Sequence, residues 1–133
     1  SLTKVMTLYM VFDALDKGEL KLDEEIPVSY RASRAAPSKL NLRAGSTIKV
    51  EDAILALVTK SANDVAIVLA ERLGGSESRF AALMTVKSRA LGMYNTRFYN
   101  ASGLPDARQI STARDLAILG NKIMTDRIHN PCI

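Results

Sequence analysis

The segment that most constrains the fold is residues 2–16, because it reads as one helix that is apolar on every side. Few polar side chains interrupt the run LTKVMTLYMVFDALD before its end: Thr3, Lys4, Thr7 and Asp13. A helix without a polar face is normally buried among other elements. We therefore expect residues 2–16 to form the central helix of the fold and to end near Gly18, a residue type that commonly terminates helices.

The rest of the chain predicts further helices and little sheet. Capping residues, acidic first turns and apolar periodicity predict helices at 51–60, at 63–74, from Ser76 to Gly92, and from Thr112-x-x-Asp115 onwards. Short strands are expected at 26–29 and 46–50, and a loop rich in Asn, Gly and Pro at 93–110. The predicted fold is mainly α, with at most short strands and four or five helices packed on helix 2–16.

Length and composition agree with one helical domain. The chain has 133 residues, no Trp, three Phe and four Tyr, so its core must be built from aliphatic side chains and Met. We expect a helical lobe at residues 1–125 and a disordered or foreign tail at 126–133. His129 and Cys132, the single His and the single Cys, are too few for a zinc site, so no metal or cofactor is expected.

The charge is mildly basic and unevenly distributed. The formal net charge is +4, which falls short of a dedicated nucleic-acid binder. No acidic residue lies between Glu25 and Glu51, whereas that stretch holds Arg31, Arg34, Lys39, Arg43 and Lys49. One interpretation is a solvated surface, and the other is attraction to an anionic polymer or membrane. No signal peptide and no apolar run long enough to cross a membrane are seen.

Ser1 and Lys4 are the first candidates for chemistry. On a helix, residues i and i+3 share one face, about 5–6 Å apart at Cβ. Serine needs a base to take its proton, and lysine serves only when burial lowers its pKa. Lys4 lies among apolar neighbours, with no acidic residue before Asp13. The alternative is a helix cap followed by a lysine that reaches solvent.

Ser61 and Asn63 are the second pair. They lie two residues apart where helix 51–60 ends and helix 63–74 begins, and a hydroxyl and a carboxamide at such a bend can face one cleft. The Ser can relay a proton, and the Asn can hydrogen-bond a peptide carbonyl or amide. The alternative is that either residue caps the helix that begins there.

These two motifs together resemble the S-x-x-K and S-x-N pair of penicillin-binding proteins and serine β-lactamases. The strings SLTKVMT, LVTKSANDVA, NASGLP and STARDLA resemble the low-molecular-mass D-alanyl-D-alanine carboxypeptidases over about residues 1–125. The resemblance implies that Ser1 is the acylated nucleophile, Lys4 its base, Ser61 a proton relay, and Asn63 a holder of the substrate backbone. It implies no cofactor.

The resemblance also implies which substrates to expect and how much activity this chain should have. The implied partners are peptidoglycan stem peptides ending in D-Ala-D-Ala and β-lactam antibiotics. The implied location is the bacterial periplasm or the extracytoplasmic face of the membrane. The family's third motif, K-T-G, is absent from the sequence, and so is the antiparallel sheet expected of the α/β parent fold. We therefore expect impaired activity in a chain that resembles only the helical lobe. Residues 92–105 hold no acid and Asp106 is the first, which favours slow deacylation over β-lactamase turnover.

Two further expectations concern partners. Without the sheet, helix 2–16 should expose an apolar side and favour self-association. The competing class of function is a non-catalytic basic helical module that binds an anionic polymer or a protein. Its best support is the basic stretch 31–49, but Tyr30, just before that stretch, is the only candidate for stacking on a base, so no nucleic-acid partner is expected.

Overall fold

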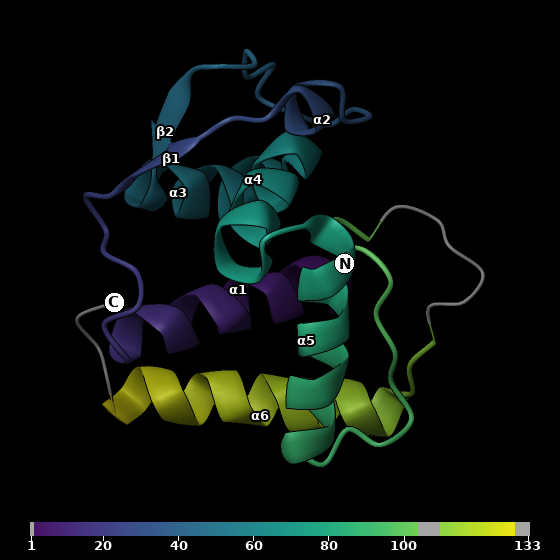
Figure 1. The fold of residues 1–133 in the computed structure, drawn as a ribbon. Coiled ribbons are helices and arrows are strands. Elements are labelled where there is room, and N and C mark those ends of the chain that lie inside the picture. Colours follow the sequence, from purple (N-terminus) through teal and green to yellow (C-terminus); the bar gives the residue numbers. More distant parts are fainter. Residues whose placement is uncertain (1, 104–109, 130–133) are drawn as a thin grey trace.

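A computed structural model describes residues 2–103 and 110–129 of the chain. Within them the fold is a group of helices with one small sheet (Figure 1). The helices are α1 (Leu2–Asp16), α2 (Tyr30–Ser33), α3 (Val50–Lys60), α4 (Asn63–Gly74), α5 (Glu77–Ala90) and α6 (Ala113–His129), and the strands are β1 (Glu25–Pro27) and β2 (Thr47–Lys49). The mainly helical class predicted from the sequence is confirmed.

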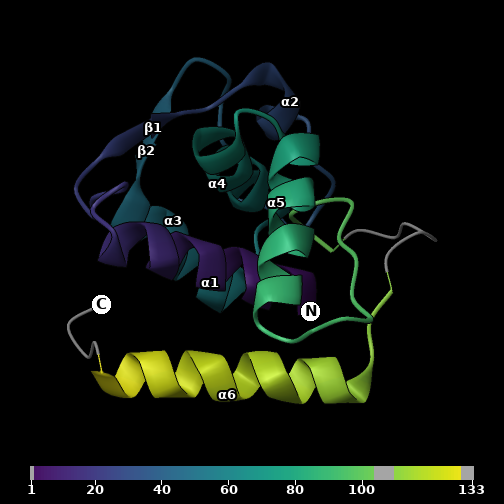
Figure 2. The ribbon, with the colours of Figure 1, turned by 60° about the horizontal axis from the view of Figure 1, so that its bottom comes forward.

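Helix α1 occupies the central position that its composition predicts. It contacts α3, α4, α5 and α6, and Figures 1 and 2 both show it between α6 and the α3–α4 part of the molecule. Its side chains Met6, Tyr9, Val11 and Ala14 are buried. Leu8, Met10, Phe12 and Leu15 are half-buried, and Val5 is 41% exposed. The apolar side that we expected to be bare is therefore covered in part.

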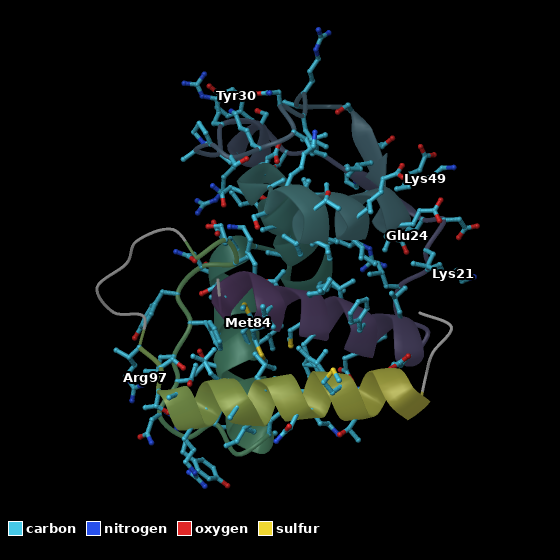
Figure 3. All side chains as sticks on the ribbon, turned by 180° about the vertical axis from the view of Figure 1, so that it is seen from behind. Lys21, Glu24, Tyr30, Lys49, Met84 and Arg97 are labelled. Carbon is cyan, nitrogen blue, oxygen red and sulfur yellow. The ribbon has the colours of Figure 1, made fainter. Side chains whose placement is uncertain are left out.

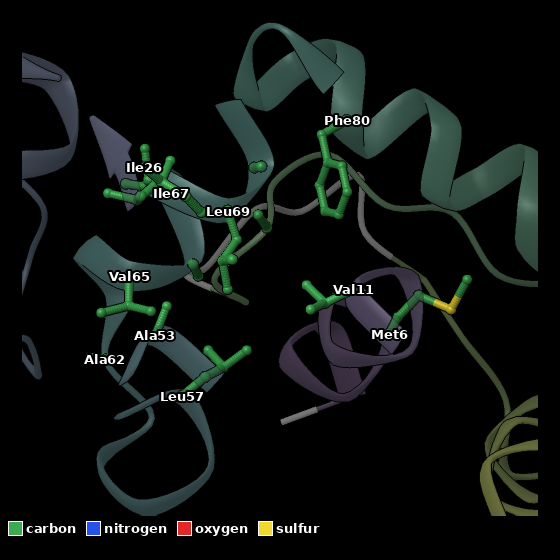
Figure 4. Close-up of a cluster of buried hydrophobic side chains, with 14 of the residues drawn as sticks. Met6, Val11, Ile26, Ala53, Leu57, Ala62, Val65, Ile67, Leu69 and Phe80 are labelled. Atoms are coloured by element: carbon green, nitrogen blue, oxygen red, sulfur yellow. The ribbon is translucent and has the colours of Figure 1, made fainter. Parts of the chain in front are cut away.

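Helix α4 is buried even more completely than α1. Every residue from 63 to 70 is buried, because α4 contacts α1, α2, α3, α5 and β1. Figure 4 shows the core that results, in which Met6 and Val11 of α1 approach Phe80 of α5 and Leu57 of α3. The first residues of α4 are therefore held in a rigid environment, and Asn63 is one of them.

The two strands form an antiparallel pair in which Ile26 lies opposite Ile48. Both isoleucines are buried while their neighbours in each strand are exposed, as expected for a sheet with one covered face. The strands are shorter than the predicted segments 26–29 and 46–50. Between them the structure adds a short helix that the sequence did not predict, α2, whose N-cap Ser29 accepts a hydrogen bond from the Ala32 N–H at 3.0 Å.

The predicted helix signals lie at the observed helix ends. The Ser76 hydroxyl accepts from the Arg79 N–H at 3.2 Å and caps α5. The Thr112 hydroxyl accepts from the Asp115 N–H at 3.1 Å at the start of α6. Helix α6 continues to His129, past the boundary expected at residue 125, and the remaining four residues lie outside the described part. No helix in the described residues is long and apolar enough to span a membrane.

Candidate active site

Lys4, the candidate base, is partly removed from solvent. It lies in the first turn of α1, between the buried residues Thr3 and Met6, and its side chain is half-buried. Burial disfavours the charged ammonium and lowers the pKa of Lys4. Ser1, the candidate nucleophile, lies outside the described residues, so its role stays a prediction from the sequence.

Ser61 and Asn63 stand at the sharp junction between α3 and α4. Ser61 ends α3 in the left-handed region, with φ 50°, and is exposed. The N-cap of α4 is Ala62, and no side chain caps that helix. The interpretation that Ser61 or Asn63 serves to cap α4 is therefore wrong. Both helices that meet at this junction contact α1, the helix that carries Lys4.

Asn63 uses one half of its side-chain amide and leaves the other half free. Its Nδ2 group donates to the carbonyls of Ala36 at 2.9 Å and Pro37 at 3.1 Å. Its Oδ1 atom is buried and has no hydrogen-bond partner among residues 2–103 and 110–129. A buried acceptor without a donor costs about 1–3 kcal/mol. The structure therefore holds a carbonyl-type acceptor that a bound N–H or ammonium group can satisfy.

Asp64, which the sequence did not single out, fastens a surface segment to the start of α4. It is fully buried, and its carboxylate accepts from the backbone N–H groups of Leu40 and Leu42, each at 3.1 Å. The Asn63 N–H donates to the Ser38 carbonyl at 2.8 Å. We call residues 36–42 the strap, because these bonds tie it across the junction. An acidic residue in a helix's first turn was the only sequence signal for this role.

The loop that carries the string NASGLP is fixed from two sides at Ala101. The Thr7 hydroxyl of α1 donates to the Ala101 carbonyl at 2.8 Å. The buried Glu77 carboxylate of α5 accepts from the Ala101 N–H at 3.1 Å and from Arg31 at 2.7 Å. The backbone before Gly103 is thus attached to the helix that bears Lys4. Leu104, Pro105 and Asp106 lie outside the described residues.

The structure thus brings three of the four predicted site residues onto packed helices that meet. Lys4 is on α1, while Ser61 and Asn63 occupy the α3–α4 junction that α1 contacts. The sequence did not single out Thr7, Asp64 and Glu77. Their side chains hydrogen-bond the strap and the loop at Ala101 and so hold both in place. Within residues 2–103 and 110–129, no cluster of His, Cys, Asp and Glu is arranged to hold a metal ion.

Residues 1–131 match the family described as D-alanyl-D-alanine carboxypeptidase, peptidase S11. The chain belongs to this family. It is 36% identical over 132 residues to D-alanyl-D-alanine carboxypeptidase DacC of Escherichia coli, covering 95% of this chain and 33% of that protein. It is 33% identical over 124 residues to DacF of Bacillus subtilis, covering 93% of this chain and 32% of the relative. The chain therefore spans about a third of the length of these relatives.

Solved structures share the same arrangement of helices. The D-alanyl-D-alanine carboxypeptidase DacD of Francisella tularensis superposes with a TM-score of 0.90 at 39% identity, over 93% of this chain and 30% of that one. Penicillin-binding protein D2 of Listeria monocytogenes, solved in an ampicillin-bound form, superposes with a TM-score of 0.81 at 35% identity, over 95% and 51%. The family resemblance noted in the motifs is confirmed.

Proposed function

We propose that Ser1, Lys4, Ser61 and Asn63 form the acylation site of a serine-type D-Ala-D-Ala carboxypeptidase. The observation that carries the proposal is the half-buried Lys4, whose pKa is lowered by burial on a helix that contacts the Ser61–Asn63 junction. A lysine with a lowered pKa holds a larger neutral fraction near pH 7, and the neutral amine is the form that accepts a proton. Membership of the carboxypeptidase family supports the same role.

The proposed reaction proceeds through an acyl-enzyme. Lys4 takes the hydroxyl proton of Ser1 while Ser1 Oγ attacks the carbonyl carbon of the penultimate D-alanine. The C–N bond to the last D-alanine then breaks, and Ser61 passes a proton to the departing nitrogen. Water finally hydrolyses the ester and restores Ser1. A β-lactam undergoes the same attack, but its amine stays tethered and the ester persists.

In this reaction the Oδ1 atom of Asn63 accepts a hydrogen bond. The sequence motif leaves open whether Asn63 binds a carbonyl or an N–H group, and its hydrogen bonds to the strap support the second choice. Both Ala36 and Pro37 accept from Nδ2, whereas the buried Oδ1 has no partner. A substrate N–H or the Lys4 ammonium formed during acylation would satisfy that oxygen. Binding of either group removes an energetic penalty that the free protein carries.

Turnover by this chain is proposed to be slow. The sequence has no K-T-G, the motif whose lysine helps to bind the substrate carboxylate in the family that the motifs resemble. The proposed substrates are peptidoglycan stem peptides that end in D-Ala-D-Ala, and β-lactams are the proposed inhibitors. The proposed location is the extracytoplasmic face of a bacterial membrane. No comparison supports the alternative of a non-catalytic basic module.

Self-association through α1 also stays a proposal. The exposed Val5 is the feature of α1 that supports it, since Met6, Tyr9, Val11 and Ala14 are covered within one chain. Light scattering across a concentration series measures it directly. A monomer at high protein concentration would contradict the proposal.

Acylation by a fluorescent penicillin, followed by intact-protein and peptide mass spectrometry, tests the proposed function. We expect one adduct, located on Ser1, that is absent from Ser1→Ala. Lys4→Met keeps the bulk of the side chain but cannot accept a proton, so it should slow labelling by roughly 10²–10⁴-fold. The control is Lys17→Met, at the exposed residue that directly follows α1, which should label at the original rate.

Three results would contradict the proposal. They are an adduct that persists in Ser1→Ala, equal slowing by Lys4→Met and Lys17→Met, and no adduct on Ser1 after overnight incubation. A circular-dichroism melt of each variant shows whether it is folded, so that a lost adduct is not mistaken for lost structure.

A further inference from the structure

A groove of about 690 Å³ opens beside the strap, outside the four proposed site residues. One wall comes from α2 and its C-cap, and the other from the loop that precedes Gly103. The side chains that matter for recognition are Tyr30, Arg31, Arg34, Tyr99, Asn100 and Ser102. A groove of this size is within the range that holds a drug-sized ligand, and it is large enough for two or three residues of an extended peptide.

The groove carries a positive charge that is not neutralised internally. Its carboxylate, Glu77, is buried and already accepts from Arg31 and from the Ala101 N–H. Arg34 is exposed, and in the described part of the chain no carboxylate forms an ion pair with it. Two guanidinium groups and one carboxylate line the groove. Glu71, outside the groove, also attracts Arg31, so both of these carboxylates act on Arg31, and the Arg34 charge is available to a ligand.

Arg34 is also oriented by an aromatic ring. Its guanidinium carbon lies 5.9 Å from the centroid of the Tyr30 ring, a distance at which a cation–π contact holds. A guanidinium is planar and weakly hydrated, and it binds carboxylates through two parallel N–H groups. Tyr30 itself is 70% exposed. The pair therefore presents a carboxylate-binding group beside an exposed apolar ring.

The basic stretch of the sequence does not form one surface. Figure 3 places Tyr30, next to Arg31, far from Lys49 across the upper part of the molecule. Lys39 donates to the Ser33 carbonyl at 3.3 Å. An extended anionic polymer would need a continuous row of cations, whereas Arg31 and Arg34 gather at one bounded groove. The arrangement therefore fits a short ligand with a localised negative charge.

Both walls of the groove are attached to the proposed acylation site. Ala36 lines the groove, and its carbonyl accepts from Asn63. Asn100 and Ser102 flank Ala101, whose carbonyl accepts from Thr7 of α1, the helix of Lys4. A substrate whose last peptide bond lies at the site has nothing beyond that bond except one D-alanine. Any part of it that reaches the groove must therefore lie on the amino-terminal side.

We propose that this groove binds a carboxylate-bearing peptide segment on the amino-terminal side of the bond that Ser1 attacks. The proposal rests on the proposed function for its orientation. Arg34 pairs with the carboxylate, Tyr30 packs against the adjacent aliphatic part of the peptide, and the strap connects this contact to Asn63. The groove is then a specificity site for acidic over neutral peptides.

The test uses two matched probes that lack D-Ala-D-Ala: N-acetyl-L-Ala-D-Glu-L-Ala amide and the same peptide with D-Gln. They differ by one carboxylate. Assigned amide spectra of the chain, recorded during titration, report where each probe binds. We expect the D-Glu probe to shift the amides of residues 34–36 and 99–102 and to bind at least fivefold more tightly than the D-Gln probe.

Arg34→Gln should abolish the difference between the probes, whereas the control Arg43→Gln, exposed in the same basic stretch, should retain it. Equal binding of the two probes, or an unchanged preference in Arg34→Gln, would overturn the proposal. Displacement of the D-Glu probe by inorganic phosphate at equal concentration would reveal a general anion site and overturn it too. Neither probe reacts with serine, so Ser1→Ala should bind them normally, and a failure here is distinct from a failure of acylation.

Discussion

Oδ2 of Asp64 accepts a hydrogen bond from the Leu42 N–H at 3.1 Å, and Oδ1 of the same carboxylate accepts from the Leu40 N–H at 3.1 Å. Asp64 is fully buried beside Asn63, whose amide holds the strap at Ala36 and Pro37. Two adjacent residues at the start of α4 thus position one segment. The strap is hydrogen-bonded to Asn63 and lines the neighbouring groove at Ala36, so its position affects both.

Asp64→Asn should destabilise the chain, because an amide cannot accept at both positions and its NH₂ would face a backbone N–H. Hydrogen bonds to charged groups contribute about 1.5–3 kcal/mol each, and we expect a loss of that order in the free energy of unfolding. Urea denaturation measures it. Asp52→Asn, in the exposed first turn of α3, is the control and should lose less than about 1 kcal/mol. Equal losses would contradict the role of Asp64.

Thr7→Val should loosen the loop at Ala101 while preserving the shape of α1. Thr7 and Thr59 form a matched pair, since the hydroxyl of each lies within hydrogen-bond distance of the carbonyl four residues earlier, at 3.0 Å and 2.7 Å. The single Thr7 proton is shared with the Ala101 carbonyl, the nearer acceptor at 2.8 Å, and this contact is buried. We expect Thr7→Val to cost about 1–3 kcal/mol and to speed amide exchange near Ala101, and we expect neither effect in Thr59→Val. Unchanged exchange near Ala101 in Thr7→Val would be the contrary result.

Gly74→Ala should be strongly destabilising, because the added Cβ would lie 2.7 Å from the backbone and Cβ of Phe80. Overpacking of this kind typically costs about 1–3 kcal/mol. The matched control is Gly120→Ala in α6, where the added Cβ has nothing within 4 Å. That change should stabilise the helix by about 0.5–1 kcal/mol. Thermal melts compare the two, and a Gly74→Ala protein that melts like Gly120→Ala would refute the close approach of α4 and α5.

Local signals in the sequence were enough to predict most helices. The apolar run 2–16 has no polar face and is central, and the caps at Ser76 and Thr112 lie where the sequence places them. The helix α2 was not predicted, because four residues are too few to show a period of 3.6. Its stability depends on Ser29 and on packing against α4, and the second of these is a contact between distant segments.

The motif residues of the site could be predicted from the sequence, but the residues that hold the neighbouring loops in place could not. Lys4, Ser61 and Asn63 stand in recognisable patterns, whereas Thr7, Asp64 and Glu77 look like ordinary helix residues in the sequence. Their roles depend on the loops that pack against them, up to 94 residues away for Thr7 and Ala101. The free Oδ1 of Asn63 likewise follows from where Ala36 and Pro37 lie, which no local pattern specifies.

The lowered pKa of Lys4 also makes a prediction about stability. The folded protein releases the Lys4 proton at a lower pH than the unfolded chain, whose lysines titrate near 10.4. Between those two pH values the unfolded state binds more protons, so the free energy of unfolding should rise with pH in that window. Lys4→Met should lack this rise. Urea denaturation of both proteins at alkaline pH measures it, and parallel curves would contradict a perturbed Lys4.

The central claim is that burial keeps Lys4 ready to accept a proton, and the most direct measurement is a carbon-13 NMR titration of the lysine ε-carbons. Lys17, which directly follows the same helix, is the internal reference, because its hydrogen bond with Asp13 raises its pKa. We predict that Lys4 titrates below the ordinary lysine value and below Lys17. A Lys4 midpoint at or above that of Lys17 would show a solvated ammonium and contradict the account.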